Sequence, residues 1–425
     1  MTSYVGIDFG TTNSTVAIAN GEGHARLVHM PHNSARSLPF WRSILFFEQG
    51  DIGNTLEVSA GADAIRRYMA TDGDGRLIQS IKSYLASANF TATQILGKRF
   101  TLEMLIAAFL VKLRRASDED LGRRAVVGRP VRYWGAEDDE DDDRAVRRMR
   151  AALELAGFEE VVFEHEPIAA ALSYATRLAR DELILVADFG GGTSDFSLMR
   201  VGPGVDSRDR AAILATGGIA VGGDNFDARV IDAVVAPSLG KGTEFCDEMG
   251  ARAPVPPWIY NHLRRWHHLS FLRTRKTLAL LERIHTGADQ RARIAQLLHV
   301  IENELGIHLN RAVESAKVTL SRDEAAQLSF RDPPVAIEAR LTRWDFEDWI
   351  DPDLEAIDQT IDRVLADAAL DAGAIDRVFV TGGSSLVPAI RALLAARFGP
   401  TALVGGEELT SVAGGLALRA RQLFV

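Results

Sequence analysis

The chain has 425 residues, of which 47% are hydrophobic and 25% are charged; this composition is typical of a folded globular protein of two or three domains and excludes wholesale disorder. With 48 Lys and Arg against 58 Asp and Glu, the net charge is −10, which argues against a general binder of nucleic acids or of anionic membranes. The single cysteine, Cys246, excludes an intrachain disulfide and a zinc site built from several cysteines, and we expect it to be a small core residue.

The amino terminus does not have the basic and apolar regions of a signal peptide. The longest apolar run, at 104–111, is too short for a transmembrane helix and fits a helix of the core. These observations predict a cytoplasmic protein in a reducing compartment.

Two segments far apart in the chain share one pattern. Residues 4–18 (YVGIDFGTTNSTVAI) and 184–198 (ILVADFGGGTSDFSL) each contain an apolar run that ends in Asp-Phe-Gly, then a Gly/Thr stretch, then alternating apolar residues. This pattern predicts a β-hairpin with a glycine-rich tip. Because the tripeptide occurs twice, beginning at Asp8 and at Asp188, the sequence predicts a duplicated fold of two similar lobes.

The remaining segments complete the two lobes. We expect residues 20–75 to be loop-rich and residues 236–300 to form a mostly helical insertion. The acidic run EDDEDDD at 137–143 precedes four arginines, which suits the dipole of a helix start, although a metal-binding tract is the alternative. The other expected elements are strands at 124–128, 160–163 and 377–381 and helices at about 141–156, 388–397 and 410–422, the last closing the second lobe.

The insertion contains a cluster of aromatic and histidine residues. His262, His267 and His268 fit the spacing of metal ligands only loosely, so a zinc site is the weaker interpretation. We expect Trp258 and Trp266 to anchor the insertion, with a partner surface as the alternative.

The two hairpin tips have the chemistry of a phosphate site. A glycine-rich turn offers backbone N–H groups to an anion without side chains in the way, and hydroxyls of Thr11, Thr12 and Thr193 add donors. Asp8 and Asp188, each at a strand end, could face each other and hold a hydrated Mg²⁺. The tips therefore predict a nucleotide between the lobes, and because no GxxxxGK[ST] sequence occurs, the protein is not a Walker-type ATPase.

These segments resemble the motifs of a known superfamily. GIDFGTTNSTVAI, ILVADFGGGTSDFSL and FVTGGSSLVPAI are similar to the two phosphate motifs and the adenosine motif of actin-like ATPases. EHEPIAAALSYA at 164–175, VGGDNFDARVID at 221–232, AVESAKVTLS at 312–321 and LTRWDFEDWI at 341–350 narrow the resemblance to DnaK-type (seventy-kilodalton heat-shock) chaperones. VVGRP at 126–130, the PVPPW insertion and the ending GGLALRARQLF resemble their shorter YegD-type branch.

The resemblance covers about residues 4–424 and implies a fold. This is the duplicated actin-like (ribonuclease H-like) α/β fold, in which two lobes, each on a mixed five-stranded sheet, surround a nucleotide cleft. The first lobe would be 1–178 and the second 179–425, with the insertion at about 236–300.

The resemblance also implies the role of each matching residue. Asp8 and Asp188 would orient a hydrated magnesium ion. The catalytic residues would be Lys82, Glu166, Asp195 and Thr193, with Lys82 contacting phosphate and the two carboxylates positioning water and metal. The phosphates would be wrapped by Gly10, Thr11, Thr12, Asn13, Gly190, Gly191 and Gly192, with Gly222, Gly223 and Asp224 in the nearest loop of the second lobe. Ribose and base would meet Glu314, Lys317 and Ser321 on one helix, and Gly382, Gly383 and Ser384 would lie behind the adenosine.

The sequence departs from this family in three places. Val318 and Leu386 stand where the family has two arginines that clasp the adenine, so we expect the base to be held loosely. Pro130 matches a proline implicated in interdomain signalling, but the turn after it differs from the family pattern. No hydrophobic linker or β-sandwich domain follows the second lobe, so we expect this chain not to clamp extended peptides.

The function expected from these features is that of an ATP-binding, slowly ATP-hydrolysing, chaperone-like protein. ATP, ADP and Mg²⁺ would be its ligands, a protein partner or client its target, and neither nucleic acid nor membrane a partner. The alternatives are a nucleotide-binding pseudo-ATPase, an actin-like filament protein and a small-molecule kinase.

Overall fold

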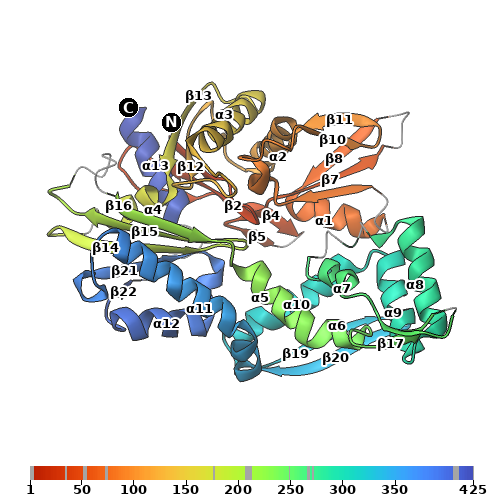
Figure 1. Ribbon diagram of the computed structural model, residues 1–425. Helices are drawn as coiled ribbons and strands as arrows, with labels where there is room; N and C mark the ends of the chain where they lie inside the picture. Colours follow the sequence, from red (N-terminus) through yellow and green to blue (C-terminus); the bar gives the residue numbers. More distant parts are fainter. Residues whose placement is uncertain are drawn as a thin grey trace. The chain divides into compact units, whose positions relative to one another are not determined.

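The computed structural model describes residues 4–33, 36–50, 55–71, 75–175, 178–205, 213–247, 249–265, 269, 272–404 and 411–424. The chain divides into two compact units, shown in Figure 1. The first unit contains Met1–Gly222, Ile357–Ser385 and Ile390–Val425, and the second contains Gly223–Ala356 and Leu386–Ala389. Both large sheets fall in the first unit, so these units are not the predicted lobes, and the lobe boundary at residues 178 and 179 stays a prediction.

The first sheet is built around the predicted amino-terminal hairpin. Its strands have the order β13-β12-β1-β2-β3, and β6 pairs additionally with β2. β1 and β2 are antiparallel, whereas β12 and β13 run parallel to β1. The bounds are β1 (Tyr4–Asp8), β2 (Asn13–Ala19), β3 (Ala25–Leu27), β6 (Trp41–Arg42), β12 (Arg124–Arg129) and β13 (Glu160–His165).

The second sheet repeats this topology. Its strands have the order β16-β15-β14-β21-β22, in which β14 and β15 form the second predicted hairpin and β21 and β22 run parallel to β14. The bounds are β14 (Glu182–Phe189), β15 (Ser194–Val201), β16 (Ile213–Ile219), β21 (Arg377–Thr381) and β22 (Leu403–Val404). Because both sheets have a hairpin flanked by parallel strands on the same side, the predicted duplicated α/β fold is confirmed.

The segment expected to be loop-rich is largely regular, so that prediction was wrong. Its elements are β3, β6, β4 (Met30–Asn33), β5 (Arg36–Leu38), β7 (Ile44–Gln49), β8 (Leu56–Ala60) and α1 (Gly61–Ala70). β7 pairs with both β8 and β9 (Arg76–Gln79), and its Leu45, Phe46 and Phe47 are fully buried. Pairing between these short strands stabilises them, and glycine content alone does not reveal such pairing.

Two helices of the first unit, α2 and α3, begin directly after residues that cap them. α2 (Leu102–Ala116) follows Thr101, whose hydroxyl accepts a hydrogen bond from the Met104 N–H at 3.3 Å. α3 (Asp139–Leu155) follows Asp138, which accepts from the Asp141 N–H at 2.9 Å, and four acids fill its first turn. The acidic run is therefore a helix start. The remaining large helices are α4 (Glu166–Ala175) and α13 (Ser411–Leu423), together with α11 (Arg343–Asp367) and α12 (Pro388–Phe398), which both contain residues of the two units.

We expected the last helix to close the second lobe, and this prediction was wrong. α13 packs against α4 and against β1, β2 and β12 of the first sheet (Figure 1). Small residues permit this approach: a Cβ at Gly415 would overlap the Ala169 carbonyl, and a Cβ at Gly6 would overlap the α13 backbone at Ala413 and Ala417.

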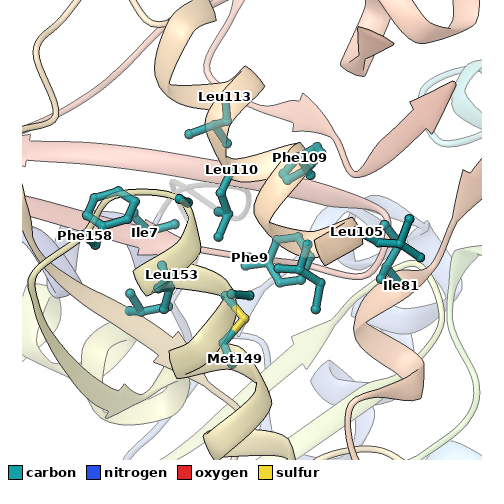
Figure 2. Packing of buried hydrophobic residues seen from close by; sticks show 14 of the residues in the cluster. Ile7, Phe9, Ile81, Leu105, Phe109, Leu110, Leu113, Met149, Leu153 and Phe158 are labelled. Atoms are coloured by element: carbon teal, nitrogen blue, oxygen red, sulfur yellow. The ribbon is translucent and has the colours of Figure 1, made fainter. Parts of the chain in front are cut away.

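One apolar cluster joins the first sheet to α2 and α3. Figure 2 shows Phe9, the residue after β1, between Phe109 of α2 and Met149 of α3, and Ile7 of β1 beside Phe158. The Phe9 and Phe109 rings lie 5.6 Å apart in a tilted arrangement. This cluster fixes the strand that ends at Asp8, which is the first residue of the predicted site.

The second unit includes residues 236–300, which are mostly helical; that they form an insertion stays a prediction. Its elements are α5 (Gly223–Val230), α6 (Ala236–Ser238), β17 (Glu244–Cys246), β18 (Arg252–Pro254), α7 (Pro257–Leu263), α8 (Arg275–Gly287), α9 (Arg291–Glu302), α10 (Gly306–Leu320), β19 (Ala325–Asp332) and β20 (Val335–Thr342). Within this unit α10 packs against the β19–β20 hairpin and α8 packs against α9.

The structure also bears on the predictions for the cysteine, for the aromatic and histidine cluster and for a membrane-spanning helix. Cys246 is exposed on β17, so the expectation of a core cysteine was wrong. Trp266, His267 and His268 lie outside the described residues, while His262 Nδ1 lies 2.9 Å from the Trp258 carbonyl oxygen. Over the described part of the chain, no helix has the length and apolar character needed to cross a bilayer.

The contact between α13 and α4 gives a prediction on stability. Gly415→Ala is expected to lower the free energy of unfolding by about 1–3 kcal/mol, because its Cβ would meet the α4 backbone. Gly414→Ala is the matched control: nothing lies within 4 Å of its Cβ, so it should raise stability by about 0.5–1 kcal/mol. Urea unfolding of both variants measures the difference, and equal effects would contradict this packing.

Candidate functional site

The two hairpin tips lie against each other in the first unit. A Cβ at Gly191 would overlap the Thr12 hydroxyl, so the second tip reaches the first. Each tip is also tight in itself: the Gly190 N–H donates to the Thr193 carbonyl at 2.9 Å, and a Cβ at Gly10 would overlap the Asn13 carbonyl. The glycines are therefore required by close backbone approach.

Neighbouring segments hold the tips in place. The Ser43 hydroxyl donates to the Gly10 carbonyl at 2.7 Å, and the Ser384 hydroxyl donates to the Gly190 carbonyl at 2.8 Å. Gly382 has a φ of +85°, and a Cβ there would overlap the Phe189 carbonyl. Ser384 thus supports a phosphate tip in this structure, and Ser43 is a supporting residue that no spacing in the sequence revealed.

A cavity of about 730 Å³ opens over these tips. Of the predicted site residues, the structure brings fifteen to its wall: Asp8, Gly10, Thr11, Thr12, Asn13, Lys82, Glu166, Asp188, Gly190, Gly191, Gly192, Thr193, Asp195, Gly382 and Gly383. Tyr133, Trp134 and Thr15 also line the cavity, although no sequence motif assigns them to a site.

One lysine and one glutamate form the central ion pair. Lys82 Nζ lies 2.8 Å from Glu166 Oε1, and each side chain is less than 15% exposed. Lys82 comes from the short 3₁₀ helix η1 (Ile81–Tyr84), and Glu166 is the first residue of α4, followed by Pro167, where an acid suits the helix dipole. Burial lowers the pKa of Lys82, but the charges of Glu166 and Asp8 outweigh this and raise it, so the ammonium stays protonated.

Three further carboxylates surround this pair. Burial, with the charge of Glu166, raises the pKa of Asp8 to about 7. Burial raises the pKa of Asp195 to about 6 although Thr193 Oγ1 donates to Asp195 Oδ2 at 2.9 Å. Burial and the charges of Glu166, Asp195 and Asp8 raise the pKa of Asp188 well above its usual range. Lys82 therefore does not compensate the negative charge of this group.

The residues present fit a magnesium ion with a nucleotide. An added cation would relieve the repulsion that raises these pKa values. Asn13, which lines the cavity, has a buried Oδ1 that accepts no hydrogen bond from any residue that the structure describes. This oxygen is therefore free to accept a hydrogen bond from a ligand. Among the residues that the structure describes, no three His, Cys, Asp or Glu side chains are placed to hold a metal directly.

Five of the predicted nucleotide residues lie in the second unit, and the structure does not place them at this cavity. Gly223 and Asp224 begin α5, and Glu314, Lys317 and Ser321 lie on or next to α10. Lys317 Nζ lies 2.9 Å from Asp227 Oδ1 and donates to the Gly223 carbonyl at 3.0 Å. Gly222 belongs to the first unit and packs against the second tip. A Cβ at this position would overlap the carbonyl oxygens of Gly190 and Gly191.

The carboxylates give a prediction on stability and pH. In the metal-free protein, Asp8 is protonated in the folded state at pH values where the unfolded chain has released the proton, so its contribution to stability falls as pH rises from about 4 to about 7. Asp8→Asn should remove this fall and stabilise the metal-free protein at pH 8 by about 1 kcal/mol, a value discounted because the group is partly accessible.

Thermal unfolding at pH 5 and pH 8 without Mg²⁺ measures this effect. Asp143→Asn, which removes an exposed carboxylate of α3, is the control and should shift neither melting temperature. An equal gain for Asp8→Asn at both pH values would show that charge is not its cause.

Comparisons with known proteins agree with this geometry. The family model described as Hsp70 protein matches residues 4–243 and 297–423, and the segment it leaves out lies within the insertion expected at 236–300. The chaperone protein DnaK of Thermosipho africanus (strain TCF52B) is 27% identical over 420 residues, and that of Thermosipho melanesiensis (strain DSM 12029 / CIP 104789 / BI429) is 28% identical over 422 residues. Each alignment covers 98% of this chain and 58% of the relative, so the chain spans a little over half the length of these relatives. A family match over most of its residues shows that this chain belongs to the Hsp70 family.

Proposed function

We propose that this protein binds Mg-ATP at the paired hairpin tips and hydrolyses it slowly, and that the nucleotide state changes its conformation toward a protein partner. The observation that carries the proposal is the cavity at which two glycine-rich tips meet a buried Lys82–Glu166 pair and three carboxylates of raised pKa. Membership of the Hsp70 family, whose curated relatives here are named as chaperones, supports the same function.

Hydrolysis would depend on positioning and charge. Backbone N–H groups of 10–13 and 190–193 would hold the β- and γ-phosphates, and the Lys82 ammonium would neutralise charge on the phosphoryl group in the transition state. Glu166 and Asp195 would align a water molecule for in-line attack and accept its hydrogen bonds. A magnesium ion bound with ATP would offset the charge shared by the phosphates, Asp8 and Asp188.

Binding at the tips is tested by a pair of glycine variants. Gly192 lines the cavity, and the nearest protein atom to its Cβ position is Thr11 Cγ2 at 4.0 Å, so Gly192→Val is expected to fold like the parent. If phosphates approach this backbone, the new side chain will exclude them, and titration calorimetry should show Mg-ATP affinity lowered about 100-fold or more. Gly21→Val is the control, since nothing lies within 4 Å of its Cβ position and its backbone does not have a positive φ. Unchanged binding by Gly192→Val would remove this cavity as the nucleotide site.

Hydrolysis is tested on the central ion pair. Lys82→Met and Glu166→Gln are expected to retain Mg-ATP and to lower the single-turnover rate about 100-fold or more, because each removes a group that acts mainly in the transition state. Binding and melting temperature, measured on the same samples, show whether the folded site survives. A parent protein that binds ATP without turnover would instead be a pseudo-ATPase, and undiminished rates in both variants would contradict the proposed mechanism.

The base would be held without cationic side chains. Val318 and Leu386, both in the second unit, are 48% and 44% exposed and offer only apolar contact. We expect ATP and GTP to bind with similar affinity. The double variant Val318→Arg and Leu386→Arg should tighten ATP binding by about 0.5–2 kcal/mol, because each guanidinium can stack on a face of the adenine. Competition titrations with both nucleotides measure this, and strong adenine selectivity in the parent would show that another residue clasps the base.

A further inference from the structure

Apolar packing fixes one side of the short helix that carries Lys82. η1 follows Ser80, which has a φ of +56°, and its Ile81 and the following Leu85 are fully buried. Figure 2 shows Ile81 beside Leu105 of α2 in the same cluster as Met149 of α3. Lys82 itself reaches across to Glu166.

The other side of this segment consists of backbone carbonyls, and one arginine of α3 binds four of them. Arg148 Nη1 donates to the carbonyls of Tyr84 at 3.3 Å, Leu85 at 3.1 Å and Ser87 at 2.8 Å, and Nη2 donates to that of Phe90 at 2.9 Å. Tyr84 ends η1, and the other three residues follow it in irregular backbone, whose carbonyls need donors from outside a helix or sheet. Arg144, one turn earlier, donates to the Ala86 carbonyl at 3.0 Å.

The guanidinium of Arg148 is itself fixed. Its side chain is 15% exposed, and Nε lies 3.4 Å from Glu103 Oε1 of α2. The next residue, Met149, is buried in the core cluster, so α3 cannot shift without disturbing that cluster. A planar group with five donors can serve several carbonyls at once, which a lysine ammonium on a flexible stem cannot do with the same geometry.

We infer that Arg148 is a positioning residue for Lys82: by binding the carbonyls of residues 84–90, it fixes the backbone that directs the Lys82 ammonium to the phosphoryl group. This inference rests on the role of Lys82 in the proposed function. Reaction rates depend strongly on placement, and a displacement of about 1 Å can lower a rate about 100-fold, so loss of Arg148 should affect chemistry more than binding.

The first test compares three arginine variants in single-turnover ATP hydrolysis. Arg148→Ala should lower the rate about tenfold or more while the Kd for Mg-ATP changes less than about threefold. Arg148→Lys, which keeps the charge and the packing of the stem, should retain the fold and still be slow. Arg147→Ala is the matched control, since this preceding arginine is exposed, and it should hydrolyse ATP like the parent.

A double variant shows whether Arg148 acts through Lys82. Adding Arg148→Ala to Lys82→Met should lower the rate no further than Lys82→Met alone, because the group being positioned is already missing. A full additional loss in the double variant would contradict the inference. A parent-like rate for Arg148→Ala would also overturn it, whereas a parent-like rate for Lys82→Met would instead overturn the proposed role of the lysine.

A second measurement does not depend on turnover. Acetylation by a limiting reagent, followed by mass spectrometry, reports how accessible Lys82 is, with the exposed Lys98 as internal reference. Arg148→Ala and Arg148→Lys should raise the reactivity of Lys82 several-fold relative to Lys98, and Arg147→Ala should not. Unchanged reactivity in both Arg148 variants would show that Arg148 does not fix the position of the lysine.

Discussion

The excess of carboxylates around Lys82 is the constraint on which the site depends. Asp8, Asp188, Asp195 and Glu166 line one cavity together with Lys82, and burial raises the pKa of the three aspartates. Such an arrangement is unfavourable without an added cation, since each ionised group repels the others in a poorly solvated space. Cavity groups with perturbed pKa values are typical of functional sites, so this cluster makes the cavity a candidate cation site.

The carboxylates converge because glycine and alanine allow close backbone contact. Asp8 is the last residue of β1 and Asp188 the next-to-last of β14, the equivalent strand of a sheet with the same topology, and the tips that follow approach until Gly191 meets Thr12. The C-terminal helix fits against β1 and α4 only because Gly6 and Gly415 have no side chain. Larger residues at these positions would separate the strand ends, and the two aspartates with them.

Arginine side chains of the helices and strands bind segments that surround the site. Arg148 binds the carbonyls that follow Lys82, and Arg419 of α13 pairs with Glu164 at 3.0 Å, two residues before Glu166. Arg129 pairs with Asp142 and its guanidinium lies 5.7 Å from the centre of the Tyr133 ring, whose hydroxyl has a pKa raised by burial to about 12. In each case a planar cation on a helix or strand holds a neighbouring segment of the cavity wall, so the site is preorganised by groups that do not line its centre.

Local sequence determined much of this protein. Alternating apolar residues with Gly/Thr tips predicted both hairpins, their repetition predicted the duplicated sheets, and the run of acids predicted the start of α3, because each of these signals depends on neighbours in the chain. Only the tertiary structure decided the rest: the strands within 20–75, the packing of α13 on β1 and α4, the exposure of Cys246, and the hold of Ser43 and Arg148 on distant carbonyls. Backbone carbonyls and pairing edges are the same for every residue type, so no pattern of side chains marks which of them a distant residue will bind.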